Sequence, residues 1–227
     1  MKAMVLSSGG IDSTTCLGLA VERFGRENVV ALSISYGQKH EKEIQASDAV
    51  AKHYGVEHIC LDLAKIFEHS NCSLLQHSTQ EIPAEAYAEQ LKKTDGKPVS
   101  TYVPFRNGLF LSSAASIAIS CGCEVIYYGA HADDAAGSAY PDCSSEFNKA
   151  ISDAIYIGSG NQLKVEAPFV NMTKAEVVKI GLERNVPYEL TWSCYEGKEE
   201  PCGVCGTCLD RAEAFRLNGV KDPAKAE

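Results

Sequence analysis

The stretch SSGGIDS, Ser7 to Ser13, joins a short apolar run to a segment with helical character that continues to Phe24. Glycines permit a positive φ and let a ligand approach the backbone closely, and a helix N-terminus presents unpaired N–H groups with a partial positive charge. The serine hydroxyls add further donors. The turn is therefore either a simple strand-to-helix connection capped by Asp12 or a phosphate-binding loop. It has neither the Gly-Lys-Ser/Thr of a Walker A loop nor a GxGxxG fingerprint.

Outward from this turn, strand-like runs rich in β-branched residues alternate with longer helix-like segments. Such alternation predicts an α/β fold of the Rossmann-like type, a doubly wound, mostly parallel five-stranded sheet with helices on both faces. Parallel sheets of this kind bind ligands outside the carboxyl ends of their strands, where the glycine turn lies. We expect strands at 3–6, 29–35, 58–63, 124–128 and 163–168, and helices at 13–24, 41–54, 107–121, 144–158 and 173–184, the last with a capping box at Thr173 and Glu176.

Two segments break this rhythm. Residues 70–100 are polar and irregular, with a short helix expected at 83–92 and a turn at Asp95-Gly96-Lys97-Pro98. A long loop inside a compact domain is usually functional or disordered, and we interpret this one as a mobile flap over the site. Residues 192–208 have neither a helical nor a strand period and need another source of order, and residues 221–227 are expected to fray.

The composition is that of a water-soluble globular protein. The 227 residues include 45% hydrophobic and 22% charged residues, with ten cysteines and a formal net charge of −9. Nucleic-acid binding relies on Lys and Arg contacts to phosphate, so the acidic charge favours small-molecule substrates and no nucleic-acid partner. No apolar run approaches the ~20 residues of a membrane span, and the N-terminus does not resemble a secretory signal. We therefore expect a cytoplasmic protein without a membrane partner.

Four cysteines crowd the stretch CYEGKEEPCGVCGTC, at Cys194, Cys202, Cys205 and Cys208. In a reducing compartment, clustered thiols are more often metal ligands than disulfides, and this spacing suits a tetrahedral Zn²⁺ site. An iron–sulfur cluster is the alternative, but the Cys-Pro that follows the ferredoxin run is missing. With all four positions taken by protein, the zinc would be structural. We expect a catalytic domain at 1–190 and a zinc-binding segment at 191–227 packed on it.

The hexad SGGIDS resembles the PP-loop of N-type ATP pyrophosphatases, which have the adenine nucleotide alpha hydrolase fold. This resemblance implies that ATP is cleaved between its α and β phosphates and that the backbone amides of Gly9, Gly10 and Ile11 hold the pyrophosphate. Asp12 would organise the loop or Mg²⁺. The nucleotide-binding residues implied are Ser7, Ser8, Gly9, Gly10, Ile11, Asp12, Ser13, Thr14, Thr15, Cys16 and Leu17.

Further stretches resemble one family, the 7-cyano-7-deazaguanine synthases, from Met4 to about Asn218. The resemblance is carried by YGQKHEKE (36–43), VPFRN (103–107), YPDCSSEF (140–147), TWSC (191–194) and PCGVCGTC (201–208). It implies an ATP-dependent carbon–nitrogen ligase of queuosine biosynthesis that converts 7-carboxy-7-deazaguanine and ammonia into 7-cyano-7-deazaguanine. The implied route adenylates the carboxylate, forms an amide with ammonia and dehydrates it with a second ATP. It also implies Mg²⁺, Zn²⁺ and a homodimer.

The catalytic candidates under this resemblance are Asp12, Ser13, Arg106, Lys174, His40 and Asp142. Arg106 and Lys174 would neutralise phosphate or the substrate carboxylate, although surface salt bridges would also explain them. His40, with Glu43, would orient nucleotide or transfer protons, and a charge pair at a helix start is the alternative. Asp142 would accept from a guanine-like N–H edge, a role open also to Asp133 and Asp134.

Three positions depart from the family pattern: Lys39 replaces an expected arginine, Phe105 a frequent glycine and Ser144 a usual arginine. Two other functions stay open. One is a different PP-loop adenylating enzyme that modifies tRNA or inserts sulfur, against which stand the acidic charge, the lack of an appended RNA-binding domain and the lack of a persulfide pair outside the cysteine cluster. The other is a non-catalytic adenine-nucleotide sensor stabilised by zinc.

Overall fold

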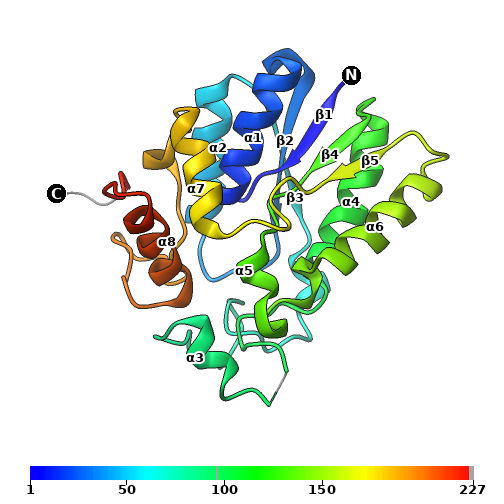
Figure 1. Ribbon diagram of the computed structural model, residues 1–227. Helices are drawn as coiled ribbons and strands as arrows, with labels where there is room; N and C mark the ends of the chain where they lie inside the picture. Colours follow the sequence, from blue (N-terminus) through cyan, green and yellow to red (C-terminus); the bar gives the residue numbers. More distant parts are fainter. Residues whose placement is uncertain (96, 225–227) are drawn as a thin grey trace.

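The computed structural model describes residues 1–95 and 97–224, and its five strands form one all-parallel sheet (Figure 1). The spatial order is β3-β2-β1-β4-β5. This confirms the predicted α/β class and sheet size, and each strand lies within two residues of its predicted bounds. The strands are β1 (Ala3–Leu6), β2 (Val29–Ser35), β3 (Glu57–Asp62), β4 (Val125–Tyr127) and β5 (Lys164–Glu166).

Helices cover both faces of the sheet, as parallel crossovers require. Figure 1 shows α1 (Ile11–Phe24), α2 (Lys42–Tyr54) and α7 (Lys174–Glu183) on one face, with α4 (Arg106–Ser120) and α6 (Ser145–Gly158) on the other. These five helices match the predicted ones to within two residues. The expected capping box is confirmed, because Thr173 and Glu176 exchange side-chain to backbone hydrogen bonds at the start of α7.

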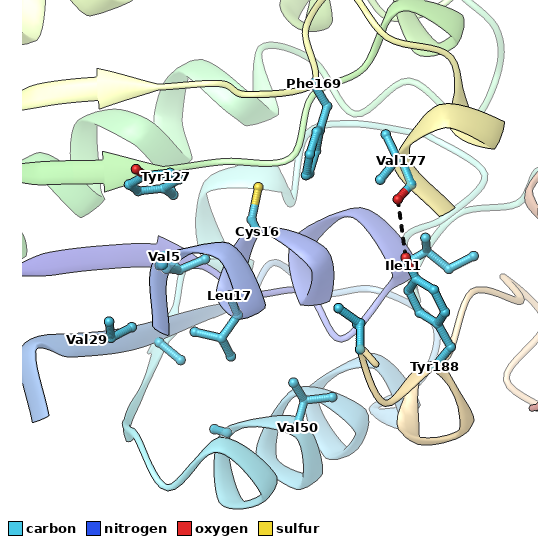
Figure 2. Close-up of a cluster of buried hydrophobic side chains, with 14 of the residues drawn as sticks. Val5, Ile11, Cys16, Leu17, Val29, Val50, Tyr127, Phe169, Val177 and Tyr188 are labelled. Atoms are coloured by element: carbon cyan, nitrogen blue, oxygen red, sulfur yellow. Dashed lines mark hydrogen bonds between the residues drawn. The ribbon is translucent and has the colours of Figure 1, made fainter. Parts of the chain in front are cut away.

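Residue alternation along the strands divides the core into two layers. On β1, Ala3 and Val5 face the α1 side, while Met4 faces the α4 side. Successive strand side chains point to opposite faces, so a strand covered on both sides is apolar throughout. Figure 2 shows the α1 side, where Val5, Leu17, Val29, Phe169 and Tyr188 belong to one buried cluster.

The strand order reverses between β1 and β4, and this point locates the site. The chain runs outward from β1 through β2 to β3, then returns to place β4 on the other side of β1. Ligands of open α/β sheets bind at such a switch, outside the carboxyl ends of the strands. The glycine turn follows β1 there, and the short helix α5 (Ala132–Ala135) follows β4.

Residues 70–95 and 97–100 form an arm beyond the carboxyl ends of the strands (Figure 1), and its mobility as a flap stays a prediction. Its helix α3 (Tyr87–Leu91) is shorter than the predicted 83–92. Backbone bonds tie the arm down, including Ser73 N–H to Ser100 O at 3.0 Å, and Leu74 and Leu75 are buried. Of the predicted turn, residue 96 lies outside the described residues. These contacts hold the two ends of the arm together and bury its first part.

Two α-helices were not predicted, the four-residue α5 and a longer helix near the C-terminus. The segment 192–208 was expected to lack regular structure, yet α8 begins at Gly206 and ends at Leu217, packing on α7. Its first turn holds Gly206 and Cys208. Residues 225–227 of the expected frayed end lie outside the described residues. Among residues 1–95 and 97–224, no helix is both long enough and apolar enough to cross a membrane.

Candidate active site

A cavity of about 220 Å³ opens at the carboxyl ends of β1, β2 and β4. The switch point of the sheet therefore holds a real recess, at the place where this fold class binds ligands. Eight of the predicted site residues line it: Ser7, Ser8, Gly10, Ile11, Asp12, Ser13, Arg106 and Lys174.

The glycine turn is held in a single shape by its own hydroxyls and by its neighbours. Ser13 Oγ accepts from Ser8 N–H at 3.1 Å and donates to Gly10 O at 3.2 Å. Gly9 has φ +80°, and a Cβ there would collide with the backbone of α2 at Glu43 and Ser47. Only glycine fits this position, because both the left-handed φ and the close packing exclude a side chain. The turn therefore places the N-terminus of α1 in the cavity wall.

Lys174 and Asp12 form an ion pair beside the turn, with His131 underneath. His131 is fully buried, and its Nε2 lies 3.3 Å from Asp134 Oδ2 and 3.8 Å from Asp12 Oδ2. Burial opposes ionisation of Asp12, but the charges of Lys174 and His131 outweigh it and lower the pKa of Asp12. The carboxylate is thus ionised and holds the ammonium in place. This cation and the helix N-terminus together form a site for an anion.

Arg106 and Glu43 bring opposite charges to another region of the cavity. The Arg106 guanidinium lies 5.3 Å from the Tyr36 ring centroid and 5.9 Å from that of Phe110, and donates to Tyr36 Oη at 3.4 Å. Burial raises the pKa of Glu43 to about 7, and Arg106 opposes the rise. Leu32 contributes to the apolar floor between them. This region suits a flat, partly polar ligand.

Several predicted site residues lie outside the cavity wall. Gly9 shapes the turn from behind. Thr14, Thr15, Cys16 and Leu17 are buried in α1, and Figure 2 shows the last two within the hydrophobic core. Thr15 Oγ1 is bonded to Tyr188 Oη at 2.8 Å. These four residues support the helix that carries the turn.

His40 and Asp142 make structural contacts and are not among the described residues that line the cavity. The His40 ring packs edge-on against Trp192, 6.4 Å between centroids. Asp142 is buried, and its Oδ2 accepts from Asn107 N–H at 2.8 Å, which satisfies a free amide in the first turn of α4. Asp142 is thus already occupied by the helix start.

Two of the departures from the family pattern also sit at helix starts. Phe105 precedes α4 with φ +54°, a left-handed conformation that favours glycine, and its ring packs edge-on against Phe147 at 5.9 Å. Ser144 caps α6, accepting from Phe147 N–H at 3.1 Å. Lys39 reaches the arm, where its Nζ donates to Gln80 O at 3.2 Å.

The four predicted cysteines come together in space, with all their Sγ atoms within 4.8 Å of one another. Tetrahedral Zn²⁺ needs Zn–S distances of about 2.3 Å, which place the sulfurs about 3.8 Å apart, so the group fits a metal of this kind. Cys194 Sγ accepts from Cys202 N–H at 3.3 Å and Glu196 N–H at 3.4 Å. Hydrogen bonds from Cys205 and Cys208 lower the pKa of Cys194, favouring the thiolate that binds metals.

The cysteine segment also builds one wall of the cavity. Trp192 N–H donates to Gly9 O at 2.9 Å, and Trp192 Nε1 donates to Cys194 O at 2.7 Å. Tyr195 Oη lies 2.8 Å from Tyr87 Oη of the arm, so arm and segment meet. Burial raises the pKa of Asp210, another wall residue, to about 6. The cysteines are therefore joined to the glycine turn through two consecutive hydrogen bonds.

Sequence reasoning did not assign several residues of this site: His131, Trp192, Tyr195, Tyr87 and Asp210. Each lies in the cavity wall or under it. Tyr195 follows Cys194 directly and Trp192 lies two residues before it in the TWSC stretch, and these are the signals that pointed toward them. The others lie on segments whose place in the cavity depends on tertiary packing, and no motif marks them.

Comparison with known proteins agrees with this geometry. Residues 2–219 match the family described as queuosine biosynthesis protein QueC. A 7-cyano-7-deazaguanine synthase from Archaeoglobus fulgidus is 46% identical over 224 residues, covering 98% of this chain and 89% of the relative. One from Caldicellulosiruptor saccharolyticus is 42% identical over 227 residues, covering 100% and 96%.

Solved structures show the same architecture. The NMN synthetase from Francisella tularensis has a TM-score of 0.52 at 17% identity, covering 97% of this chain and 78% of that one, which is a likeness of fold. Full-length identity above 40% is the decisive finding. This chain belongs to the queuosine biosynthesis protein QueC family.

Proposed function

We propose that this protein is an ATP-dependent carbon–nitrogen ligase that converts 7-carboxy-7-deazaguanine and ammonia into 7-cyano-7-deazaguanine. The name shared by relatives at 42% and 46% identity supports the product. The observation that carries the chemistry is the Asp12–Lys174 pair beside the N-terminus of α1, both lining one cavity. The acidic net charge of −9 supports a free small-molecule substrate.

The reaction needs two activations because an oxygen of a carboxylate is a poor leaving group. In the first, the substrate carboxylate attacks the α-phosphate of ATP and pyrophosphate departs, giving an acyl adenylate. Ammonia then displaces AMP and loses a proton, leaving the amide. In the second, the amide oxygen attacks the α-phosphate of another ATP and releases pyrophosphate, and AMP leaves with that oxygen as the nitrogen loses two protons. The product is the nitrile.

The residues of the turn suit the departing pyrophosphate. Ser8, Gly10, Ile11 and Ser13 line the cavity, and their N–H and hydroxyl groups are donors. Gly10 N–H donates to Ser8 Oγ at 3.3 Å and Ser13 Oγ donates to Gly10 O at 3.2 Å, so these bonds hold the donors in place within the turn until phosphate oxygens replace their acceptors. Donors that are positioned in advance stabilise developing charge without reorganising. Lys174 would neutralise the phosphates, and its position is set by Asp12.

The same residues fit the implied metals. Asp12 Oδ1 is buried and has no hydrogen-bond partner among the described residues, so this carboxylate oxygen would hold Mg²⁺ together with the nucleotide phosphates. Mg²⁺ neutralises phosphate charge when bound. The four cysteines would hold a structural Zn²⁺ in the segment 191–227, packed on the catalytic domain at 1–190.

The test incubates purified protein with ATP, 7-carboxy-7-deazaguanine and ammonium, and follows nitrile, AMP and pyrophosphate by mass spectrometry. We expect Lys174→Gln to reduce AMP release about 100- to 1,000-fold, because one stabilising cationic donor is lost. Lys179→Gln, an exposed lysine on the same helix, should stay within about twofold of wild type.

Release of ADP and phosphate instead of AMP and pyrophosphate would contradict the proposal. AMP release that requires added tRNA would favour a different adenylating enzyme. Tight ATP binding without turnover would favour a nucleotide sensor.

A further inference from the structure

Four carboxylates line the cavity: Asp12, Glu43, Asp134 and Asp210. Three of them lie near Lys174 or His131. Asp12 pairs with Lys174, Asp134 lies 3.3 Å from His131 Nε2, and Asp210 is in the field of Lys174. Asp210 and Glu43 have neither a hydrogen-bond partner nor an ion pair among the described residues, and Lys174 and Arg106 act on them only at longer range. The two differ in their nearest cation: Lys174 is already paired with Asp12, whereas Arg106 has no ion-pair partner in the described part of the chain. A carboxylate left in this state in a cavity wall is available to a ligand.

Arg106 complements it. Its guanidinium is half-buried against the rings of Tyr36 and Phe110, and across the described residues it has no carboxylate within salt-bridge distance. Burying a charge without a partner costs free energy, which a ligand with matching groups would recover. A ligand that fits must therefore offer donors to Glu43 and an acceptor to Arg106. The apolar residues Leu32 and Ile34 complete the wall on this side of the cavity.

We propose that Glu43 is the residue that recognises the deazaguanine ring, accepting hydrogen bonds from its N1–H and 2-amino groups while Arg106 donates to the adjacent ring carbonyl. This inference rests on the proposed function for the identity of the ligand. It moves edge recognition from Asp142, whose carboxylate is taken by Asn107, to a carboxylate that faces the cavity.

The donor pattern distinguishes the two bases that enter this site. Guanine-type rings present two adjacent donors, which match the two oxygens of one carboxylate. Adenine presents one donor beside an acceptor, so a carboxylate facing it would set one oxygen against a lone pair. Glu43 is therefore complementary to the deazaguanine substrate and mismatched to the base of ATP. Burial raises the pKa of Glu43 to about 7, and donors from a ligand would favour its ionised form.

The experiment combines a variant with a substrate analogue. We compare wild type and Glu43→Gln on 7-carboxy-7-deazaguanine and on the analogue that lacks the 2-amino group, measuring kcat and KM from AMP release. Wild type should prefer the amino substrate about 10- to 100-fold in kcat/KM, the range expected for hydrogen bonds to a charged group. Glu43→Gln should lose most of this preference through KM with little change in kcat, because the amide offers one acceptor and turns N–H groups toward the ligand donors.

Two further variants provide controls. Glu41→Gln changes an exposed glutamate two residues earlier and should keep the wild-type preference. Glu43→Asp keeps the charge on a shorter side chain and should recover some of the preference, which a merely structural role would not predict. Both are checked for folding by circular dichroism.

The Glu43 assignment and the proposed function fail in different ways. If Glu43→Gln discriminates between the substrates as wild type does, or raises the KM of ATP alone, the assignment of Glu43 is overturned. Calorimetric titration of 7-carboxy-7-deazaguanine without ATP gives an independent reading: loss of binding in Glu43→Gln but not in Glu41→Gln supports the assignment even without turnover. If wild type binds the deazaguanine but never forms AMP, it is the proposed function that fails.

Discussion

Single residues of this site carry charges that the fold stabilises to different degrees. Asp12 and Lys174 neutralise each other, and His131 beneath them adds a third contact. Burial makes the ionised form of the Glu43 carboxyl less favourable and so raises its pKa. Functional residues often reduce stability in this way, since the group that awaits a ligand is unsatisfied without it. For Glu43, this cost is measurable as a change in the free energy of unfolding with pH.

We predict that Glu43→Gln stabilises the protein in a pH-dependent way. The pKa of Glu43 rises from 4.5 to about 7 on folding, so between these pH values the folded state binds more protons than the unfolded state. The free energy of unfolding therefore falls as pH rises through this window. Replacing the carboxyl with a neutral amide removes the effect, so the variant should exceed wild type by about 1–2 kcal/mol at pH 8, after allowance for partial exposure, and by roughly a quarter of that at pH 5.

Urea unfolding at both pH values measures this difference, with Glu41→Gln as the exposed control. An equal difference between variant and wild type at pH 5 and pH 8 would show that Glu43 carries no burial cost.

At the scale of elements, the cysteine segment and the glycine turn act as one unit. Trp192 joins them, donating from its backbone to Gly9 O and from its indole to Cys194 O. Lys42 of α2 lies 4.4 Å from the centroid of the Trp192 ring, which adds a cation–π contact. A metal held by the cysteines would therefore order the loop that binds phosphate as well as its own segment.

We predict that Cys205→Ser lowers metal content, thermal stability and ATP affinity together. Losing one of four ligands weakens the site, and binding to the folded state is what makes a structural metal stabilising. We expect ATP affinity to fall because the wall containing Trp192 loses its anchor. Elemental analysis, thermal unfolding and calorimetry with ATP are the measurements.

Cys60→Ser, at an exposed cysteine, serves as the matched control and should change none of the three. Metal loss with unchanged ATP affinity would rule out the coupling through Trp192. Iron instead of zinc in the wild-type protein would overturn the zinc assignment.

At the scale of the whole molecule, one buried arginine, Arg211, joins parts of the C-terminal segment to one another and to Tyr188, shortly before it. Arg211 of α8 binds Asp222 in two parallel bonds of 2.7 and 2.8 Å, and both side chains are buried. The same guanidinium donates to Thr191 Oγ1 at 2.8 Å and Tyr188 O at 3.2 Å. This one arginine therefore links α8, the chain end at Asp222 and the stretch that leads to Trp192.

We predict that Asp222→Ala lowers the free energy of unfolding by about 3–5 kcal/mol, because it leaves a buried guanidinium without its carboxylate. Glu213→Ala breaks the exposed pair with Arg216 on the same helix and should change the free energy of unfolding far less, because water screens an exposed pair. Urea denaturation of both variants tests the contrast. Similar costs for the two would mean that Arg211 finds other partners, and two separate transitions would mean that 191–227 unfolds apart from 1–190.

Much of the fold and some of the site were predictable because the signals are local. Strand and helix periods, the glycine turn and the capping box at Thr173 depend on residues a few positions apart, and the structure bears out the elements. Helix α8 was missed because its start carries Gly206 and Cys208, which lack helical periodicity and are ordered through tertiary contacts with α7 and the cysteine group.

The sequence alone determined the parallel sheet, the place of the glycine turn after β1 and the grouping of four cysteines, because each follows from spacing along the chain. Only the tertiary structure decided which charged side chains share the cavity. It brought Glu43, Arg106 and Lys174 to one recess. Asp142 instead binds the start of α4, and His40 packs against Trp192. The reason is physical: whether a buried charge is satisfied depends on neighbours that approach from distant regions of the chain.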